Sequence, residues 1–581
     1  MLALSIGALA LALASPAAAA QCRNQPGDAG FPSQAQWNQL KAELGGRLVQ
    51  PIPTAKYCKL NNCTTAEWQS TDLRALLPGA MNSNNWEQDY ATPSMCLLNG
   101  TTCEQGSVPL YAVNATTAAH VQAGVRFAAQ HNLRLSIKAS GHDFLGRSTA
   151  KNSLLIWTQY LKNTSFTEHF RIGNKDYGAA MTTGSGAGLK QLYTEAEAHG
   201  KIFVGGTAAT VCAAGGYSQG AGHSAFSPVL GLAADNAIEY QIVIANGSLI
   251  TANEFSHPDL FWAIRGGGGG SWGVIVSATF HAFPIFNATL HQTTIVTNST
   301  VQTGNVMAAH AAHIFDLDPV RAGQYYYLSG SPGGSFMSVS TFAANVTGDD
   351  LRARLKPFLD AARAAGATVS PEVTVSGTPN DLIPNGDWAI EQIVANLTTA
   401  NPPNTTVAWG DDVSGQNLIM GSRLIPSSAF KNNASAIGAA YTTLLNQGVP
   451  GILGHLVAGG QVAANAHVNN AVNPKWRTAK SHVIVSQGWV DSSVSPQQVE
   501  ALRHNLTYVS MPVLDAVTGE SDAGSYSSEG DVLEPKFQTT FFGPNYARLK
   551  SVKATYDPHD LFIVGAGVGS ENWDEYGLCR K

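Results

Sequence analysis

The segment KASGHDFLGRS, residues 138–148, directly follows the apolar run LRLSI of residues 133–137. The run predicts a strand, and the small residues after it predict a turn. A loop built from alanine, serine and glycine lets its backbone approach another group closely. Because His142 lies in this loop, the segment combines a close-contact backbone with a nucleophilic imidazole.

Three further glycine-rich loops occur along the chain, at residues 184–188, 215–222 and 266–273. Like the loop at residues 139–146, each follows a stretch that predicts a strand. Backbone N–H groups exposed in such loops can bind phosphate groups. A single loop of this kind is usually only a turn, but four of them favour one large ligand that spans several loops.

The residues around these loops alternate between strand and helix patterns. Residues 109–116 (PLYAVNAT) and 133–141 are strand-like, and residues 117–132 are helix-like. Residues 238–252 (IEYQIVIANGSLITA) predict a β-hairpin around an Asn-Gly turn. This alternation indicates an α/β region.

Residues 286–520 show a different pattern. The strands YYYLSG (325–330) and FMSVSTFAA (336–344) are joined by SPGG, which predicts a hairpin, and helices such as residues 349–366 are separated from them. This pattern indicates an antiparallel sheet flanked by helices. The expected fold class is therefore α+β, with a two-part α/β ligand-binding domain and a second domain.

We expect five segments along the chain. They are a signal peptide at residues 1–20, a disulfide-tied extension at 21–106 that packs outside, an α/β part at 107–285, a second domain at 286–520, and a C-terminal segment at 521–581 that completes the α/β domain.

The N-terminus predicts secretion. Residues 1–20 form an apolar stretch that ends in small residues, with cleavage expected after Ala18 or Ala20, although a basic start is missing. Five of the seven cysteines lie within the first 103 residues, which suits disulfides in the extension. Cys96 and Cys103 enclose a short Gly-containing loop and are expected to bond. Because seven is odd, at least one thiol stays free or is used chemically.

Twelve N-x-S/T sequons agree with a secreted glycoprotein, although several arise by chance and only some are expected to carry glycan. They are Asn62, Asn99, Asn114, Asn163, Asn246, Asn287, Asn298, Asn345, Asn396, Asn404, Asn433 and Asn505.

The composition argues against several partners. Charged residues make up 13% of the 581 residues, about half of the ~25% that is usual. The net charge of −6 gives no basic surface, so nucleic acid is not an expected partner. After the N-terminal stretch no run approaches the ~18 apolar residues of a membrane span, so no membrane is expected. We assign no metal site from the sequence, and we expect a monomer.

Two common nucleotide motifs do not fit. GSGAGL, residues 184–189, has Leu189 where a dinucleotide-binding fingerprint needs its third glycine, and GGGGGSWG lacks the Lys-Ser/Thr of a P-loop. A serine hydrolase is a separate alternative, because Gly216-Tyr217-Ser218-Gln219-Gly220 matches G-x-S-x-G. That motif needs a strand before the serine and a helix after it.

A set of motifs carries a family resemblance. It comprises SGHD (140–143), TVCAAGGYSQGAGHS (210–224), GLAADN (231–236), DLFWAIRGGG (259–268) and FFGPNYARLK (541–550). Together they resemble the vanillyl-alcohol-oxidase (VAO) type of FAD-linked oxidases, whose FAD-binding domain is called PCMH-type. The similarity is closest to the berberine-bridge-enzyme-like branch and its secreted fungal members, and covers about residues 107–285 and 440–581.

The resemblance implies an FAD cofactor bonded covalently through His142 to the 8α-methyl group of the flavin. It also implies that the pyrophosphate lies on backbone N–H groups of residues 139–143. The residues expected to hold FAD are Lys138, Ala139, Ser140, Gly141, His142, Asp143, Gly146, Gly206, Thr210, Val211, Gly215, Gly216, Gly220, Gly222, His223, Asp235, Gly273, Val274, Val276, Asn545 and Tyr546.

The chain departs from the family at the second flavin bond. Many relatives have a cysteine where this chain has Ala208, and Cys212 lies four residues further on. The resemblance therefore implies a single covalent bond, with Cys212 as an off-register alternative. Val211 falls on a position that faces the oxygen-reacting side, where valine goes with oxidase behaviour in the family.

The catalytic candidates are Tyr526, His455 and Gln461. Tyr526 matches a family tyrosine that assists proton removal, and its alternative role is packing at the flavin edge. Glu529 replaces the family's second tyrosine. Relatives often take a base from the region of residues 454–477, which here offers His455, Gln461 and Trp476 but no carboxylate.

The resemblance implies hydride transfer from an alcohol or hemiacetal carbon of a small alcohol or sugar-like substrate to FAD, with O2 reduced to H2O2. The alternatives are the serine hydrolase and a glycoprotein that binds a flavin or ligand without catalysis.

Overall fold

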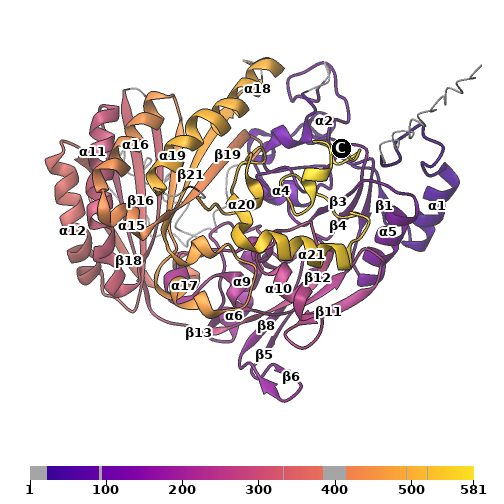
Figure 1. Cartoon of the computed structure of the whole chain (residues 1–581), viewed down its shortest axis with the longest axis horizontal. Coiled ribbons are helices and arrows are strands. Elements are labelled where there is room, and N and C mark those ends of the chain that lie inside the picture. The colour runs from indigo at the N-terminus through magenta and orange to yellow at the C-terminus, as the bar shows by residue number, and fades with distance from the viewer. Residues whose placement is uncertain are drawn as a thin grey trace, which may run out of the picture.

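The computed structural model describes residues 22–90, 95–331, 333–383, 414–491, 494–519, 521 and 523–581. The expected signal peptide and the sequons Asn396 and Asn404 lie outside the described residues. Two bodies lie side by side in Figure 1: a loop domain, formed by described residues of 22–285 and 521–581, and a sheet domain, formed by described residues of 286–519.

The loop domain contains a first sheet in the order β1-β2-β4-β3. Its strands are β1 (Leu48–Val49), β2 (Tyr111–Asn114), β4 (Leu154–Trp157) and β3 (Leu135–Lys138). Strands β2 and β3 are both parallel to β4, and helix α5 (Ala118–Gln130) packs on β2 and β4. The side chain of Thr117 caps this helix by accepting a hydrogen bond from the His120 N–H.

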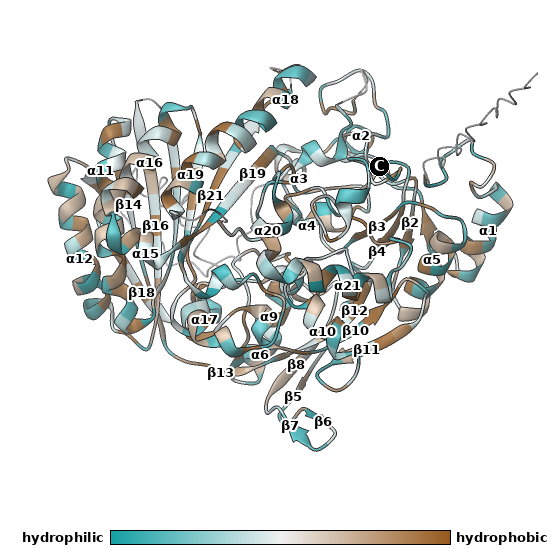
Figure 2. Ribbon diagram, in the orientation of Figure 1, coloured by the Kyte–Doolittle hydropathy of each residue, from teal (hydrophilic) through white to brown (hydrophobic). Residues whose placement is uncertain are grey.

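A second sheet in the loop domain is antiparallel, in the order β11-β10-β12-β8-β5. Its strands are β11 (Leu249–Asn253), β10 (Ala237–Val243), β12 (Val274–His281), β8 (Ala180–Gly184) and β5 (Thr164–Thr167). The predicted hairpin is confirmed, because β10 pairs with β11 across a turn in which Gly247 has φ +79°. Figure 2 shows hydrophobic residues along these strands and hydrophilic residues on peripheral helices such as α18 (Pro496–Asn505).

The sheet domain contains an antiparallel sheet in the order β17-β14-β16-β15-β20-β21-β19, with β18 also paired to β14. The strands are β14 (Ala288–Thr297), β15 (Gly323–Ser331), β16 (Gly334–Ala344), β17 (Thr368–Val369), β18 (Val373–Gly377), β19 (Asn417–Pro426), β20 (Gly451–Leu456) and β21 (Ala479–Trp489). The predicted hairpin of residues 325–344 is therefore confirmed.

Helices cover the outer face of this sheet (Figure 1). They are α11 (Thr300–His313), α12 (Gly348–Ala364), α16 (Ala434–Asn446) and α19 (Met511–Thr518). Side chains alternate across the sheet: Tyr326 packs in the core shared with these helices, whereas Tyr325 packs in the core shared with the loop domain. The inner face of the sheet therefore lies against the glycine loops.

The N-terminal extension takes part in the loop domain instead of only packing outside it. Its β1 pairs with β2, and its buried Glu87 forms an ion pair of 3.2 Å with buried Arg74. A short strand and a buried charge pair are hard to find in a turn-rich sequence, because both depend on distant partners.

The disulfide expectations are met in part. Cys96 bonds to Cys103 as predicted, and Cys212 is free. Cys22, however, bonds to Cys579 across a sequence separation of 557 residues, so it ties the two ends of the described chain together. Cys58 bonds to Cys63. Among the described residues, no helix is both long and apolar enough to cross a membrane.

Candidate active site

The four predicted glycine loops meet in space. A Cβ atom built on Gly215 would lie 3.4 Å from the Cβ of Ala139, and one built on Gly269 would lie 3.0 Å from the Cα of Gly216. Gly188 forms an isolated β-bridge with Cys212, which joins the loop at 184–188 to the group. Loops that are far apart in sequence therefore form one cradle.

His142 lies inside this cradle. Its Nε2 atom is 2.5 Å from the Thr210 hydroxyl oxygen, so the loop at 139–146 contacts the segment at 206–211. The residue before it, Gly141, has φ +100°, and a Cβ there would also meet the Ala80 carbonyl oxygen at 3.2 Å. A larger residue at position 141 would shift the histidine.

Lys138 turns its side chain away from the cradle. Its Nζ donates hydrogen bonds to the carbonyl oxygens of Leu77 at 2.6 Å and Arg74 at 3.1 Å. Burial lowers the pKa of this amine to about 7; the charge of Glu87 opposes this shift, and the charge of Arg74 adds to it. At position 138 a ligand in the cradle would therefore meet backbone and not the ammonium group.

The cradle has open space, and a buried polar group without a hydrogen-bond partner, that a large cofactor could occupy and contact. A Cβ on Gly216 would meet nothing within 4 Å, so this residue borders open space between the loops. The nearby Ser185 hydroxyl is buried and has no hydrogen-bond partner among the described residues. The loop backbones, His142 and the Ser185 hydroxyl fit the requirements of FAD.

Cys212 is placed near His142 but is a poor nucleophile. Its Sγ lies 3.7 Å from the Thr210 carbonyl oxygen, and the side chain is buried. Burial raises the pKa of the thiol to about 11, with Ser140 and Lys162 acting weakly in the other direction. Since the thiolate is the reactive form, the imidazole is the better nucleophile in this cradle at neutral pH.

The remaining predicted FAD residues line the cradle or support it. Val211 is half-buried against the core, and the carbonyl of Val276 accepts a hydrogen bond from the Ser185 N–H. A Cβ on Gly206 would be in van der Waals contact with the Tyr217 ring at 3.7 Å. Val274 is buried. At four glycines a Cβ would clash with the chain, which explains the residue type by packing; these are Gly146, Gly220, Gly222 and Gly273.

Three predicted FAD residues bind protein groups through their side chains. Asp235 forms a buried ion pair with Arg477, with an oxygen–nitrogen distance of 2.7 Å. Asn545 donates to the carbonyl oxygens of Ala471 and Val472, and Tyr546 donates to the Glu571 carboxylate. These side chains hold the walls of the cradle together. The Asp143 carboxylate similarly accepts the Leu145 and Ser148 N–H groups within its own loop.

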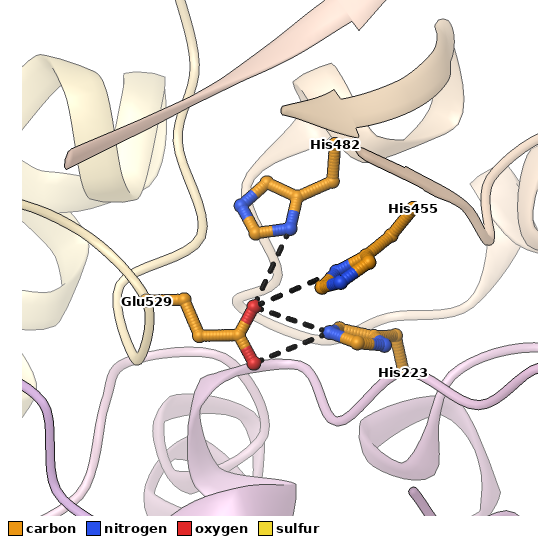
Figure 3. Close-up of side chains that lie close together, drawn as sticks. All are labelled: His223, His455, His482 and Glu529. Carbon is orange, nitrogen blue, oxygen red and sulfur yellow. Dashed lines mark hydrogen bonds and ion pairs between the residues drawn. The ribbon is translucent and has the colours of Figure 1, made fainter. Parts of the chain in front are cut away.

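A cluster of His223, His455, His482 and Glu529 lies where the cradle meets the sheet domain (Figure 3). Strand register explains two of its members, because His455 on β20 and His482 on β21 are directly opposite in an antiparallel pair. Tyr325 on β15 is opposite His455 on the other side, so the three rings form a row on the inner face. His223 and Glu529 reach this row from the loop domain.

The Glu529 carboxylate is the centre of the cluster. Its Oε2 lies 3.3 Å from His223 Nε2, 3.5 Å from His482 Nδ1 and 3.9 Å from His455 Nδ1. Burial lowers the pKa of His482 to about 3 and that of His455 well below its usual value. Both rings are therefore neutral. Burial alone would raise the pKa of Glu529, but the opposing effect of the histidines, His223 above all, keeps that pKa below its usual range.

Of the three predicted catalytic residues, one belongs to this cluster and two do not. His455 is a member, whereas Gln461 donates its amide to Asn465 and belongs to the wall around Asp235. Tyr526 lies edge-on to His223 and His482, but its hydroxyl accepts from the Gly222 N–H at 3.2 Å and donates to the Tyr217 carbonyl at 3.4 Å. Burial raises the pKa of Tyr526 well above its usual value.

His482 is a member of the cluster that the sequence does not predict. It lies inside the apolar strand AKSHVIVSQGW (479–489), where a single polar residue is the available signal. Glu529 was noticed only as a replacement for a tyrosine. Trp476, named among the candidates of residues 454–477, lies beside the cluster, with its ring centre 5.8 Å from that of His482.

The serine hydrolase interpretation is wrong. Ser218 follows a π-helical turn of residues 213–217 and not a strand, and only a short helix at 218–220 comes after it. Its side chain is fully buried and accepts a hydrogen bond from the Tyr240 hydroxyl at 3.2 Å. The nucleophile elbow therefore does not form.

Comparison with known proteins connects this site to flavoproteins. Residues 109–253 match the family described as FAD binding domain, and residues 525–569 match the family described as berberine and berberine like. An uncharacterized FAD-linked oxidoreductase of Arthroderma benhamiae is 36% identical over 96% of this chain and 96% of its own length. A VAO-type flavoprotein oxidase of Thermothelomyces thermophilus is 32% identical over 96% of this chain and 95% of its own.

A solved structure extends the likeness to the whole fold. The crystal structure of a VAO-type flavoprotein from Myceliophthora thermophila C1 superposes with a TM-score of 0.82 and 29% identity, over 97% of this chain and 100% of that one. Of the family matches, residues 109–253 contain three of the four glycine loops, and residues 525–569 contain Glu529.

Proposed function

Because the chain belongs to the VAO-type, berberine-bridge-enzyme-like family of FAD-linked oxidoreductases, we propose that it is a secreted oxidase with covalently bound FAD. When bound, FAD would accept a hydride from an alcohol or hemiacetal carbon of a small molecule and pass two electrons to O2, giving H2O2. The observation that carries this proposal is the meeting of His142 with four glycine loops opposite a buried polar cluster.

His142 is the proposed tether. A neutral imidazole is a competent nucleophile, and the Thr210 hydroxyl beside Nε2 fixes the ring orientation. The backbone of residues 139–143 would hold the diphosphate, because the small residues Ala139, Ser140 and Gly141 let a ligand approach the main chain closely. Cys212, as a buried thiol, would stay unmodified.

The polar cluster is the proposed contact for the reacting oxygen of the substrate. Glu529 is the ionised group of the cluster, and its neighbours His455 and His482 are neutral and buried. The aromatic rings of Tyr325, Trp476 and Tyr526 surround the cluster and exclude water. The substrate hydroxyl would lose its proton to this group while its carbon faces the cradle.

Three features support the secreted location. The three disulfides need an oxidising compartment to form. Nine sequon asparagines of the described residues are exposed: Asn62, Asn99, Asn163, Asn246, Asn287, Asn298, Asn345, Asn433 and Asn505. The apolar N-terminal stretch supplies the export signal. We propose a monomer with a small-molecule substrate, and O2 as the oxidant.

A substrate screen tests the proposed reaction. The purified protein is incubated in air with a panel of alcohols and sugars while H2O2 is followed, and the flavin absorbance is followed in parallel without oxygen. A substrate of the proposed class bleaches the flavin without oxygen and yields one H2O2 per oxidised molecule in air. A protein whose flavin stays oxidised with every member would be a ligand-binding flavoprotein, contrary to the proposal.

A further inference from the structure

We propose that His223, His455, His482 and Glu529 bind a divalent transition-metal ion between the loop domain and the sheet domain. The binding itself is independent of the proposed oxidase function. The position of the ion beside the substrate rests on that function.

The spacing of the cluster is the first argument. The three nitrogen–oxygen distances to Glu529 Oε2 are 3.3, 3.5 and 3.9 Å, and one ligand atom from each residue lies within 4.8 Å of all the others. An N–H···O hydrogen bond usually measures ~2.7–3.2 Å, so these contacts are long. Four ligands at ~2.0–2.2 Å from a tetrahedral zinc ion are about 3.4 Å apart, which matches the shorter two distances closely.

The second argument is that the cluster contains buried histidine nitrogens without hydrogen-bond partners. Both ring nitrogens of His482 and the Nδ1 atom of His455 are buried and have no hydrogen-bond partner among the described residues. His482 is fully inaccessible to solvent. A buried polar atom without a partner costs about 1–3 kcal/mol, and a cation at the centre of the cluster would serve the Nδ1 atoms of both rings.

Charge and ligand type select the kind of ion. Among the described residues the Glu529 carboxylate pairs with no lysine or arginine, and its contacts are with the three histidines, so a cation would neutralise a carboxylate that is 18% exposed. Three imidazoles and one carboxylate suit zinc, iron, nickel, copper or cobalt. Calcium and magnesium prefer sites made wholly of oxygen ligands, so they are poor candidates.

The elements behind the ligands fit a metal site. His455 and His482 are held rigidly by paired strands, and His223 Nδ1 lies 3.4 Å from the Tyr325 hydroxyl, as an outer-shell partner would. His223 directly follows Gly222, the last residue of the glycine loop at 215–222, and the Gly222 N–H donates to the Tyr526 hydroxyl. An ion bound by His223 would therefore lie beside the cradle.

Metal analysis of the full, flavin-loaded protein tests the proposal. The protein is purified without chelator and its metals are counted per chain by mass spectrometry. Chelator-treated protein is then titrated with Zn2+, Mn2+, Co2+, Ni2+, Cu2+ and Fe2+. We expect about one ion per chain that restores the melting temperature lowered by the chelator, since the ion joins two domains.

Two variants and one control localise the ion. His482→Ala and Glu529→Gln should weaken binding by at least about tenfold, because even outer-shell partners of a metal are worth that much. His291→Ala is the matched control, since His291 is buried in a His–Glu pair of 3.0 Å with Glu372 elsewhere in the sheet domain. It should leave the metal content unchanged.

The outcomes separate this inference from the proposed function. Protein that carries FAD and makes H2O2, yet binds none of the six ions after titration, overturns the metal site and leaves the oxidase intact. Equal metal loss in His291→Ala and His482→Ala also overturns it. One bound ion in a protein without oxidase activity supports the metal site while contradicting the proposed reaction.

Discussion

Single side chains in this protein are placed by contacts that the sequence shows only in part. His142 and Cys212 lie in one cradle, but burial raises the thiol pKa to about 11, which separates their reactivity. The motif predicted the position of His142. The neutral state of His455 and His482 could not be predicted, because it depends on burial by distant strands.

Tyr526→Phe tests whether this tyrosine is a base or a wall residue. Its hydroxyl is engaged by the Gly222 N–H and the Tyr217 carbonyl, so we expect kcat to fall less than about tenfold and stability by about 1 kcal/mol. Glu529→Gln should instead lower kcat by about 10²–10⁴-fold, the usual contribution of a proton-accepting group. Steady-state kinetics on the best substrate of the screen would show the contrast, and equal losses in both variants would restore Tyr526 as the base.

Lys138 predicts a pH-dependent stability. Burial lowers its pKa from 10.5 to about 7 in the folded protein, so between these values the unfolded chain binds the additional proton. Raising the pH from about 7 to about 10 therefore stabilises the folded state, by up to ~4 kcal/mol. Lys138→Met lacks this contribution.

Urea unfolding of both proteins at several pH values measures the effect. The stability of the wild type relative to Lys138→Met should increase steadily toward alkaline pH. A difference that does not change with pH would show that the amine keeps an ordinary pKa in its contacts with the Leu77 and Arg74 carbonyls.

At the scale of elements, local patterns predicted most strands and loops. The Asn-Gly hairpin and the SPGG hairpin follow from turn chemistry. The opposition of His455 and His482 does not, because the register that pairs two residues 27 positions apart is set by the whole sheet. The Ser218 motif failed for a similar reason, since the π-helical turn before it depends on packing against other glycine loops.

Gly216→Ala tests the cradle as an element. A Cβ at this position meets no protein atom within 4 Å, so the variant should fold with an unchanged melting temperature in its flavin-free form. The methyl group would enter the space assigned to FAD, so the ratio of flavin to protein absorbance should fall severalfold. Gly333→Ala, at the tip of the β15–β16 hairpin, is the control, because a Cβ there would meet only the Ser331 hydroxyl, in van der Waals contact at 3.7 Å. If the Gly216→Ala variant still bound a full complement of flavin, the cofactor would have to lie elsewhere in the protein.

For the whole molecule, the Cys22–Cys579 bond holds together segments that are 557 residues apart. Clustered cysteines suggested bonds within the extension, and this long-range bond could not be predicted because it requires the folded proximity of both ends. Closing a long loop restricts the unfolded chain strongly, with a typical contribution of about 2–5 kcal/mol.

The variant Cys22→Ser/Cys579→Ser should therefore melt at a clearly lower temperature than the wild type. Cys58→Ser/Cys63→Ser is the matched control, because its bond closes a separation of only 5 residues and should matter less. Thermal unfolding followed by circular dichroism gives both values. If removing the Cys58–Cys63 bond lowered the melting temperature as much as, or more than, removing the Cys22–Cys579 bond, the stabilising role assigned to the Cys22–Cys579 bond would be contradicted.

The central claim is that His142 holds FAD covalently in a cradle of glycine loops. The direct measurement is acid precipitation of the native protein, followed by a denaturing gel and peptide mass analysis. We predict that the flavin stays with the protein, gives a fluorescent band, and adds the mass of FAD to the peptide containing residues 138–148. In His142→Ala the flavin should be extracted by denaturant while the fold persists. Free FAD released from the wild-type protein by acid would contradict the claim.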